Sequence, residues 1–360
     1  MELLRRKYVQ ISGLYKLIAT KKETPLSLGA VLEKQAERFR DRPLILFENR
    51  VITYGQFNEA ANRYAWLFLS HGFKKGDIVA LLMGNRPEFL IAHAGLAKAG
   101  IVPALVNSNI KGSVLAHALN IADASAVIVG HEFLKEYLEA AGEVRLRPPR
   151  AVYIENEGRP VKTPAGVRDI AKLLDAQPDA NPLVPEPVTS FDILEYIYTS
   201  GTTGMPKATK LSHHNWLQLG YGNGGYIFGI LPGEVHYCCL PLYHNSGINI
   251  AWAATLMYGG TLALRRKFSA TSFLDDVRSC NAKTFVYVGE LCRYLNNLPE
   301  KPDDGDNPLR TIVGNGMRGD YWREFQKRFK IGRIVEVYGS TEGVGALMNL
   351  KGKPGMIGRL

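Results

Sequence analysis

Short apolar runs alternate with amphipathic stretches along most of the chain. Runs of this length, bounded by turn residues, are typical of buried strands. They occupy residues 44–47, 51–54, 78–83, 101–106, 126–129, 193–199, 262–264, 284–288, 311–313 and 334–337. The first two runs flank a polar tripeptide and predict a hairpin. The rhythm as a whole predicts an α/β fold, built as stacked β/α subdomains with mostly parallel sheets.

Helical spacing fills several intervals between these runs. One helix is predicted to stop at Gly72, another to begin at Pro87, and a third to start from a cap at Ser113. Prolines crowd residues 141–190, which reads as a surface connection with one short helix near residues 169–174.

The first residues form a stretch of a different kind. Apolar side chains recur there near helical spacing, and basic side chains surround them. The apolar ones are Leu4, Tyr8, Ile11, Leu14, Tyr15 and Ile18. Residues 1–25 can therefore make peripheral contact with a membrane as a basic amphipathic helix, or pack on a protein; the pattern leaves both open. We divide the chain into an N-terminal segment (1–40), a first subdomain (41–190) and a second subdomain (191–360).

Composition narrows the class of protein. The chain has 360 residues, of which 46% are hydrophobic, which is enough for more than one domain. A formal charge of +10 fits either a polyanion ligand or a surface kept soluble by lysine. The four cysteines lack metal-ligand spacing, which favours a reduced, cytoplasmic setting. No run approaches the roughly 20 apolar residues of a membrane span, and we expect no nucleic-acid partner.

The most informative segment follows the run at 193–199. It reads Tyr198, Thr199, Ser200, Gly201, Thr202, Thr203, Gly204, Met205, Pro206 and Lys207. Glycines let backbone approach a ligand, and the hydroxyls, N–H groups and Lys207 suit phosphate oxygens. This is not a Walker loop, because Pro206 precedes Lys207 and Ala208 follows it.

A second polar segment closes the run at 334–337. Tyr338 can stack on a purine, Thr341 offers a hydroxyl, and Glu342 offers a hard carboxylate oxygen for Mg²⁺. Taken alone, a Glu in such a loop is often only solvated or caps a helix.

A competing fingerprint lies between these two segments. Residues 314–319 match Gly-x-Gly-x-x-Gly, and Glu336 follows at about the distance of a ribose-binding acid. Taken alone, this pattern predicts a dinucleotide-dependent oxidoreductase. It leaves both polar segments unexplained, so we interpret Glu336 as a structural residue.

The segment from Tyr198 to Lys207 resembles the signature of the acyl-adenylate-forming (AMP-binding) superfamily, and Tyr338, Gly339, Thr341 and Glu342 resemble its Tyr-Gly-x-Thr-Glu motif. The resemblance implies adenine stacking by Tyr338, phosphate contact by Thr341 and Mg²⁺ binding by Glu342. It also implies that a Gly-rich segment lines the adenine pocket, here at Gly314, Asn315 and Gly316.

Residues 240–247 resemble the superfamily's Pro-Leu-x-His segment, which approaches the acyl carboxylate. His244 is accordingly a candidate catalytic residue with Lys207, Thr341 and Glu342, although a hydrogen-bonded core histidine would look the same. Candidates for an acyl tunnel lie along residues 248–258 and 286–295, where Trp252 and Tyr287 could equally be plain core.

Softer stretches resemble the fatty-acid-transport-protein and very-long-chain acyl-CoA synthetase branch. They are residues 109–117, 267–273, 286–294 and 314–318. The branch implies ATP-dependent activation of a long- or very-long-chain fatty acid, through an acyl-adenylate, to acyl-CoA, with coenzyme A as co-substrate. The alternative is a membrane-associated fatty-acid uptake protein, peripheral at the inner face of a membrane.

The resembling enzymes continue beyond the counterpart of Leu360 with a ribose-binding Asp, a hinge and a small lid that carries the adenylating lysine. None of these has a counterpart in the sequence. We therefore expect this chain to bind nucleotide weakly and to be severely impaired in acyl-CoA synthesis.

Overall fold

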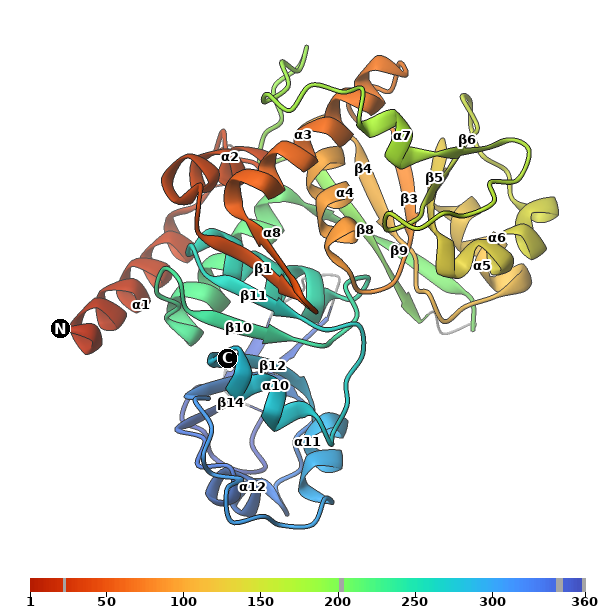
Figure 1. Cartoon of the computed structure of the whole chain (residues 1–360). Helices are drawn as coiled ribbons and strands as arrows, with labels where there is room; N and C mark the ends of the chain where they lie inside the picture. The colour runs from red at the N-terminus through yellow and green to blue at the C-terminus, as the bar shows by residue number, and fades with distance from the viewer. Residues whose placement is uncertain (22–23, 201–203, 341–345, 358–360) are drawn as a thin grey trace.

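Two β-sheets with helices packed around them make up the fold (Figure 1). The computed structural model describes residues 1–21, 24–200, 204–340 and 346–357. Within those residues the first sheet has seven strands in the order β7-β6-β5-β3-β4-β8-β9. All its pairs are parallel except β8 with β9. The strands are β3 (Ile78–Leu82), β4 (Val102–Leu105), β5 (Ala126–Gly130), β6 (Ala151–Glu155), β7 (Val167–Asp169), β8 (Ile193–Ser200) and β9 (Pro206–Ser212).

The second sheet has eight strands among the described residues, in the order β15-β14-β13-β12-β10-β11-β1-β2. Only the two edge pairs, β1 with β2 and β14 with β15, are antiparallel. The strands are β1 (Pro43–Phe47), β2 (Arg50–Thr53), β10 (Val235–Cys238), β11 (Thr261–Leu264), β12 (Ala282–Val288), β13 (Thr311–Asn315), β14 (Arg333–Gly339) and β15 (Ala346–Asn349). The predicted α/β class with mostly parallel sheets is confirmed.

Helices cover both sheets, as parallel strands require. The α-helices are α1 (Glu2–Ala19), α2 (Leu28–Phe39), α3 (Tyr54–Ser70), α4 (Pro87–Lys98), α5 (Gly112–Ile121), α6 (Leu134–Ala140), α7 (Ile170–Leu174), α8 (His213–Gly220), α9 (Ala253–Met257), α10 (Phe273–Ser279), α11 (Gly289–Asn296) and α12 (Trp322–Arg328). Two π-helical segments, η3 (Tyr221–Phe228) and η4 (Ser246–Trp252), continue α8 and precede α9.

Several local predictions are confirmed. The β1–β2 hairpin forms around residues 48–49, and α3 ends just before Gly72, whose φ of 82° suits glycine. Pro87 is the first residue of α4. The predicted short helix is α7, where Asp169 accepts a hydrogen bond from the Ala171 N–H at 3.2 Å.

Two local predictions are wrong. Ser113 does not cap α5, because the extended residue before the helix is Lys111 and the helix already includes Gly112. Residues 141–190 are also more than a surface connection, since β6 and β7 lie within them and join the first sheet. The prolines of this region lie outside both strands, so they do not interrupt the ladder.

The sheets exchange strands across the proposed boundary near residue 190. The early hairpin β1–β2 belongs to the second sheet, whereas β8 and β9 belong to the first. The division into 41–190 and 191–360 stays a prediction about folding units, but sheet membership crosses it in both directions.

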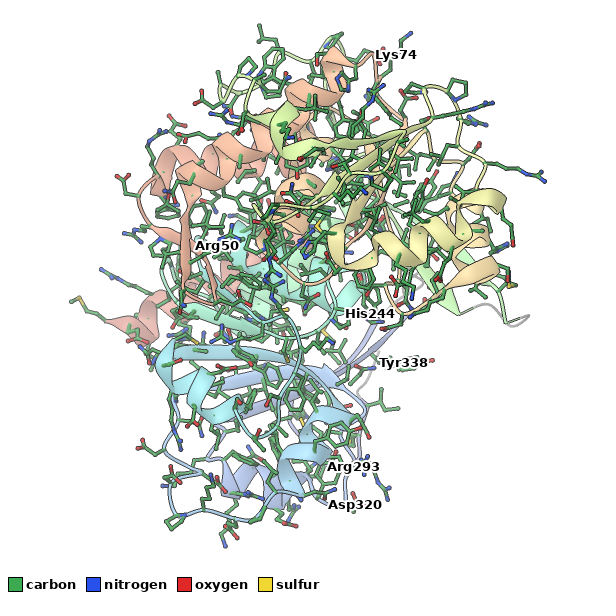
Figure 2. All side chains as sticks on the ribbon, turned by 45° about the vertical axis from the view of Figure 1, so that its right-hand side comes forward. Arg50, Lys74, His244, Arg293, Asp320 and Tyr338 are labelled. Carbon is green, nitrogen blue, oxygen red and sulfur yellow. The ribbon has the colours of Figure 1, made fainter. Side chains whose placement is uncertain are left out.

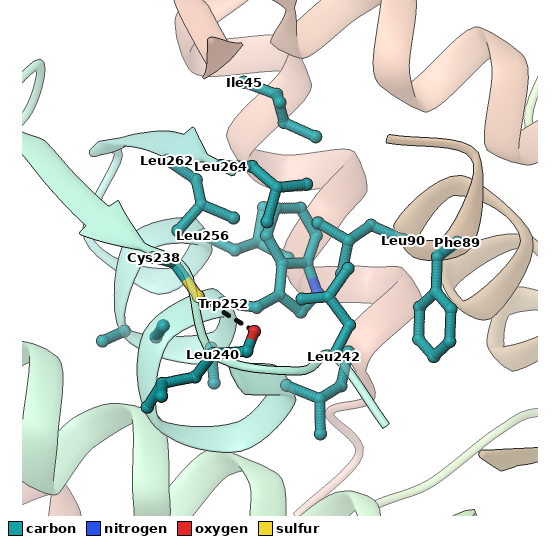
Figure 3. Packing of buried hydrophobic residues seen from close by; sticks show 14 of the residues in the cluster. Ile45, Phe89, Leu90, Cys238, Leu240, Leu242, Trp252, Leu256, Leu262 and Leu264 are labelled. Carbon is teal, nitrogen blue, oxygen red and sulfur yellow. Dashed lines mark hydrogen bonds between the residues drawn. The ribbon is translucent and has the colours of Figure 1, made fainter. Parts of the chain in front are cut away.

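One hydrophobic core joins the two sheets through the helices between them. In β3, Val79 and Leu81 belong to that shared core, while Ala80 and Leu82 face a second core under α5 and α6. The alternation fits a strand buried on both faces. Figure 3 shows Trp252 of η4 in the shared core among leucines that follow or belong to β10 and β11, so Trp252 is plain core.

Helix α1 is attached by its polar side. Gly13 is its buried residue, and the Arg6 guanidinium donates to the Gly229 carbonyl at 2.8 Å and to the Glu234 carboxylate at 2.8 Å. Burial alone would raise the pKa of Glu234, but the hydrogen bond from Arg6 and the charge of Arg310 outweigh it and lower that pKa. The pairing therefore stays charged through neutral pH and fixes the helix on the body.

The apolar stripe of α1 is largely exposed to solvent. Five of its six members keep exposed fractions of 70–77%, and they are Leu4, Tyr8, Ile11, Tyr15 and Ile18, whereas Leu14 is 37% exposed. Leu4 and Tyr8 also line a cavity between α1 and the body. No helix in the described part of the chain is long and apolar enough to cross a membrane.

A buried arginine stabilises the first sheet. The Arg86 side chain has no exposed surface, and its guanidinium lies 2.5 Å from a Glu155 carboxylate oxygen and 3.6 Å from one of Glu157. Glu157 also pairs with Arg266, which follows β11. The cluster thus connects the ends of strands from both sheets.

We predict that Arg86→Met lowers the free energy of unfolding by about 3–5 kcal/mol, because it leaves the buried Glu155 carboxyl group without its cationic partner. Urea denaturation measures this. The control is Arg63→Met, whose exposed pair with Asp179 at 3.6 Å contributes at most about 1 kcal/mol. Equal effects of the two substitutions would contradict the prediction.

Candidate functional site

The Thr/Ser/Gly-rich segment forms the tip of a β-hairpin. Thr199 in β8 lies opposite Lys207 in β9, and Ser200 lies opposite Pro206. Residues Gly201, Thr202 and Thr203 lie outside the described residues. Gly204 has a φ of 82°, a conformation that favours glycine, and no described atom lies within 4 Å of the place where its Cβ would stand. The sequence predicted the first strand and the loop but not the return strand β9.

Two side chains of this hairpin have different surroundings. The Tyr198 hydroxyl donates to the Ala118 carbonyl at 2.7 Å, so it fastens β8 to α5. Lys207 is exposed and makes no ion pair with any residue that the structure describes. The ammonium of Lys207 is therefore available to an anion, whereas the Tyr198 hydroxyl is already used.

The glycine-rich segment after β13 is held by close backbone packing. A Cβ on Gly314 would lie 2.1 Å from the Tyr287 carbonyl oxygen, and one on Gly289 would lie 1.8 Å from the Gly316 carbonyl oxygen. Gly316 itself has a φ of 84°. Only glycine satisfies these positions, so the segment follows a fixed path beside β12.

Glu336 explains that path. Its carboxylate accepts hydrogen bonds from the Gly316 N–H and the Met317 N–H, both at 2.9 Å, and from the Tyr287 hydroxyl at 2.6 Å. Only 6% of Glu336 is exposed. A ribose-binding acid needs free oxygens at the surface, so the dinucleotide fingerprint does not hold and Glu336 is structural, as expected.

Tyr338 stands at the exposed end of β14. The residue is 63% exposed and lies opposite Leu347 of β15, with Gly339 opposite Ala346. Thr341 and Glu342 lie outside the described residues. Among the residues that are described, no group of three His, Cys, Asp or Glu side chains could hold a metal ion.

The segment that carries His244 is clamped from the first sheet. The buried Asn85 amide, between β3 and α4, donates to the Leu240 carbonyl at 2.8 Å and accepts from the Leu242 N–H at 2.9 Å. Figure 3 shows Leu240 and Leu242 in the buried hydrophobic cluster. These two hydrogen bonds fix the position of the backbone that leads to His244. No local sequence pattern predicted the role of Asn85.

The imidazole ring of His244 is held in one orientation by a hydrogen bond. Its Nδ1 lies 3.2 Å from the Ser246 N–H, which donates to it. Although the side chain is exposed, desolvation by the surrounding protein lowers the pKa of His244. The ring is therefore neutral at pH 7, and its Nε2–H is left as a donor.

A buried polar chain runs from this segment into the first sheet. The Asn249 amide donates to Asn245 Oδ1 at 3.0 Å and to Glu195 Oε1 at 2.5 Å, and Glu195 Oε2 lies 2.7 Å from His93 Nε2. Glu195 and His93 have no exposed surface. A Glu inside the apolar run at 193–199 was the visible signal, because a buried carboxylate needs partners.

One cavity of about 420 Å³ collects residues from these separate segments. Of the predicted site residues it brings together His244, Gly314, Asn315, Tyr338 and Gly339. Figure 2 shows His244 and Tyr338 on the same side of the molecule. The described residues of the β8–β9 tip, and Gly316, are not among its lining.

The cavity combines polar and apolar walls. Asn315, Tyr338 and Ser340 come from the ends of β13 and β14. Apolar side chains come from strand faces and helices, and they include Leu17, Leu219, Ile250, Val286, Val313 and Val337. Ile250 and Val286 belong to the two predicted tunnel stretches, whereas Tyr287 is core. An exposed aromatic ring beside amide groups suits a base, and the apolar walls suit a hydrocarbon.

Comparison with known proteins identifies the family. Residues 32–360 match the family described as AMP-binding enzyme. The chain is 35% identical over 328 residues to medium/long-chain-fatty-acid–CoA ligase FadD6 of Mycobacterium tuberculosis, covering 91% of this chain and 53% of that protein. It is 37% identical over 340 residues to long-chain fatty acid transport protein 6 of Mus musculus, covering 92% and 53%.

A solved structure shares the fold. The anthranilate CoA ligase AuaEII in complex with anthranoyl-AMP superposes with a TM-score of 0.84 at 19% identity, over 96% of this chain and 66% of that one. The chain spans about half the length of the curated relatives it matches. With the family match extending over most of its length, the chain belongs to the AMP-binding enzymes, the adenylate-forming family of acyl-CoA ligases.

Proposed function

We propose that this chain carries the ATP- and acyl-binding part of an enzyme that activates a long- or very-long-chain fatty acid to acyl-CoA. The observation that carries the proposal is the single cavity that joins Tyr338 and Asn315 to His244 and an apolar wall. A nucleotide base and a hydrocarbon chain need these two kinds of surface side by side. The relatives named for fatty-acid–CoA ligation and fatty-acid transport support the same substrate class.

The reaction has two steps. A carboxylate oxygen of the fatty acid attacks the α-phosphorus of ATP, and pyrophosphate leaves, which yields a mixed acyl-phosphate anhydride. The thiolate sulfur of coenzyme A then attacks the acyl carbonyl carbon, and AMP leaves. The contribution of the protein in the first step is to position the reactants and to stabilise charge on the phosphates.

The site residues divide between the nucleotide and the acid. The exposed Tyr338 ring stacks on adenine, and Gly314 and Asn315 form the backbone edge beside it. Gly316, the next residue of the Gly-rich segment, continues that edge outside the cavity lining. Hydroxyls and N–H groups of the hairpin tip, from Tyr198 to Gly204, with Lys207 and Thr341, hold the phosphates. The Tyr198 hydroxyl acts indirectly, by fastening β8 to α5.

His244 and Mg²⁺ complete the assignment. The neutral imidazole, with Nδ1 occupied by the Ser246 N–H, presents Nε2–H to the fatty carboxylate. The donor set suits a magnesium–phosphate complex, because such ions are bound by one or two carboxylates with the phosphates themselves. Glu342 would supply that carboxylate, and the ion would neutralise phosphate charge.

A second proposal concerns where the protein works. The solvent-facing apolar stripe of α1 is flanked by Arg5, Lys7 and Lys16, which suits the interface of an anionic bilayer. We propose that residues 1–25 hold the protein at a membrane surface, where fatty acid partitions. A role in fatty-acid uptake would use the same membrane contact. Conversion of the fatty acid to acyl-CoA would remove the free acid and so favour its further uptake.

Adenylation is tested by incubating the chain with ATP, Mg²⁺ and oleate and detecting oleoyl-adenylate by mass spectrometry. We expect only a low yield of oleoyl-AMP, in keeping with the weak nucleotide binding that the sequence predicts. Lys207→Ala should lower that yield by a further tenfold or so, because a charge-assisted contact to phosphate is lost. Lys210→Ala is the matched control on the same strand, since Lys210 lies over the Tyr196 ring. Equal yields in both variants would refute the assignment of Lys207.

Adenine stacking is tested by calorimetry with AMP. Tyr338→Ala is expected to weaken AMP binding about 10- to 100-fold, because one base–aromatic stack contributes roughly 1–3 kcal/mol. The control is Tyr294→Ala, which removes another exposed ring, on α11 and outside the cavity. Unchanged AMP affinity in Tyr338→Ala would exclude the stack.

The membrane proposal is tested by sedimentation with vesicles containing phosphatidylserine. We expect binding that weakens with salt, and about a tenfold loss when Tyr8, Ile11 and Tyr15 are all replaced by Ser, because three apolar side chains no longer enter the interface. Leu183→Ser, at another exposed apolar residue, is the control. Wild-type protein that stays in the supernatant would contradict the proposal.

A further inference from the structure

We infer that Leu17 of α1 sets the acyl chain length that the cavity accepts, so that a helix outside the family-matched region 32–360 is part of the substrate site. The inference rests on the proposed function and adds a specificity-determining residue to it. Its basis is the position of one side chain on a helix whose apolar stripe is largely exposed to solvent.

Leu17 differs from the exposed stripe residues of that helix. It is partly buried and lines the same cavity as Tyr338 and His244, whereas Tyr15 and Ile18 beside it are more than 70% exposed. Its two methyl carbons lie 3.7 and 3.9 Å from the place where a Cβ on Gly222 would stand. Gly222 also lines the cavity, so Leu17 fills the space that this glycine leaves open.

The wall that Leu17 forms is held firmly. Gly13 packs directly on η3, where a Cβ on it would lie 2.7 Å from the Tyr226 nitrogen and 2.8 Å from the Gly225 Cα. Arg6, about two helical turns before Gly13, is paired with Glu234. Backbone contact at one point and a charged pair at another leave α1 little freedom to move away from the cavity.

The position of Leu17 predicts how the cavity distinguishes acyl chains of different length. Polar residues of the cavity come from strand ends, and the helix layer supplies Leu219, Gly222 and Leu17. A carboxylate held near His244 would extend its chain along the apolar wall toward that layer. Each methylene buried there should raise affinity about fourfold, until the chain end meets the Leu17 side chain.

The test uses unreactive acyl-adenylate mimics, acyl-sulfamoyl adenosines from hexanoyl to octadecanoyl, and measures their affinity by calorimetry. For the wild-type chain we expect affinity to rise with length and then level off. Leu17→Trp should move that limit to shorter chains and weaken the longest mimic about tenfold or more, since an enlarged side chain excludes it. Leu17→Ala should move the limit to longer chains.

Two further variants separate an effect of Leu17 from a general effect on helix α1. Leu14→Ala is the matched control, because Leu14 lies on the same helix and does not line the cavity. Gly13→Val should lift α1 from η3 and remove the length limit without altering any cavity residue. Thermal unfolding of each variant checks that the body remains folded.

The outcomes separate the inference from the function on which it rests. If the mimics bind and all Leu17 and Gly13 variants keep the wild-type length profile, Leu17 does not read chain length, while the proposed function stands. If neither AMP nor any mimic binds, the proposed function fails and this inference fails with it. A shifted limit in the Leu17 variants, absent in Leu14→Ala, supports the inference.

Discussion

The carboxylate of Glu336 holds together the strand ends on which the cavity is built. It stands on β14, accepts from the Tyr287 hydroxyl of β12, and accepts from two N–H groups directly after β13. Three adjacent parallel strands thereby end around one buried anion. Such an anion is stable only when donors surround it, so the loop after β13 must take the path that supplies them. That path leaves Asn315 exposed beside the cavity, next to the exposed ring of Tyr338.

The second constraint is the link between the two sheets. Asn85 reaches from the first sheet to the backbone of residues 240–242, and the chain from Asn245 through Asn249 and Glu195 ends on His93 in α4. These contacts join the strand that leads to the hydroxyl-rich hairpin tip with the segment that carries His244. This buried polar chain resists sliding of one sheet on the other, because a shift would leave the Glu195 carboxylate without its partners. The relative position of the two halves of the site thus depends largely on buried residues outside the cavity, with Asn245 as the member of the chain that also lines it.

Local sequence patterns predicted the positions of the strands better than the pairing between strands. Apolar runs located most strands, and the hydroxyl-rich loop, the glycine-rich segment and Tyr338 were each placed correctly at strand ends. The exchange of β1–β2 and β8–β9 between sheets was not predictable from those runs, because pairing depends on contacts far apart in the chain. Strand β6 was not predicted because prolines surround it in the sequence. Strand β9 was not predicted because it begins with Pro206 and Lys207, which were interpreted as part of the loop. Glu195 carried a readable signal, since a carboxylate amid apolar residues implied a buried partner, but its identity as His93 required the fold.

Helix α1 shows that the fold does not use all the hydrophobic free energy available in its sequence. Burying a large apolar side chain is worth about 1.5–3 kcal/mol, yet five such residues on α1 remain exposed while Gly13 and Arg6 make the attachment. The Gly13 contact and the Glu234 pair fix α1 in an orientation that leaves most of its apolar stripe exposed. The same orientation turns Leu17 into the cavity and the stripe toward solvent. Whatever covers the stripe therefore acts on an element that also forms a wall of the substrate site, which physically connects the outer surface of α1 to the acyl pocket.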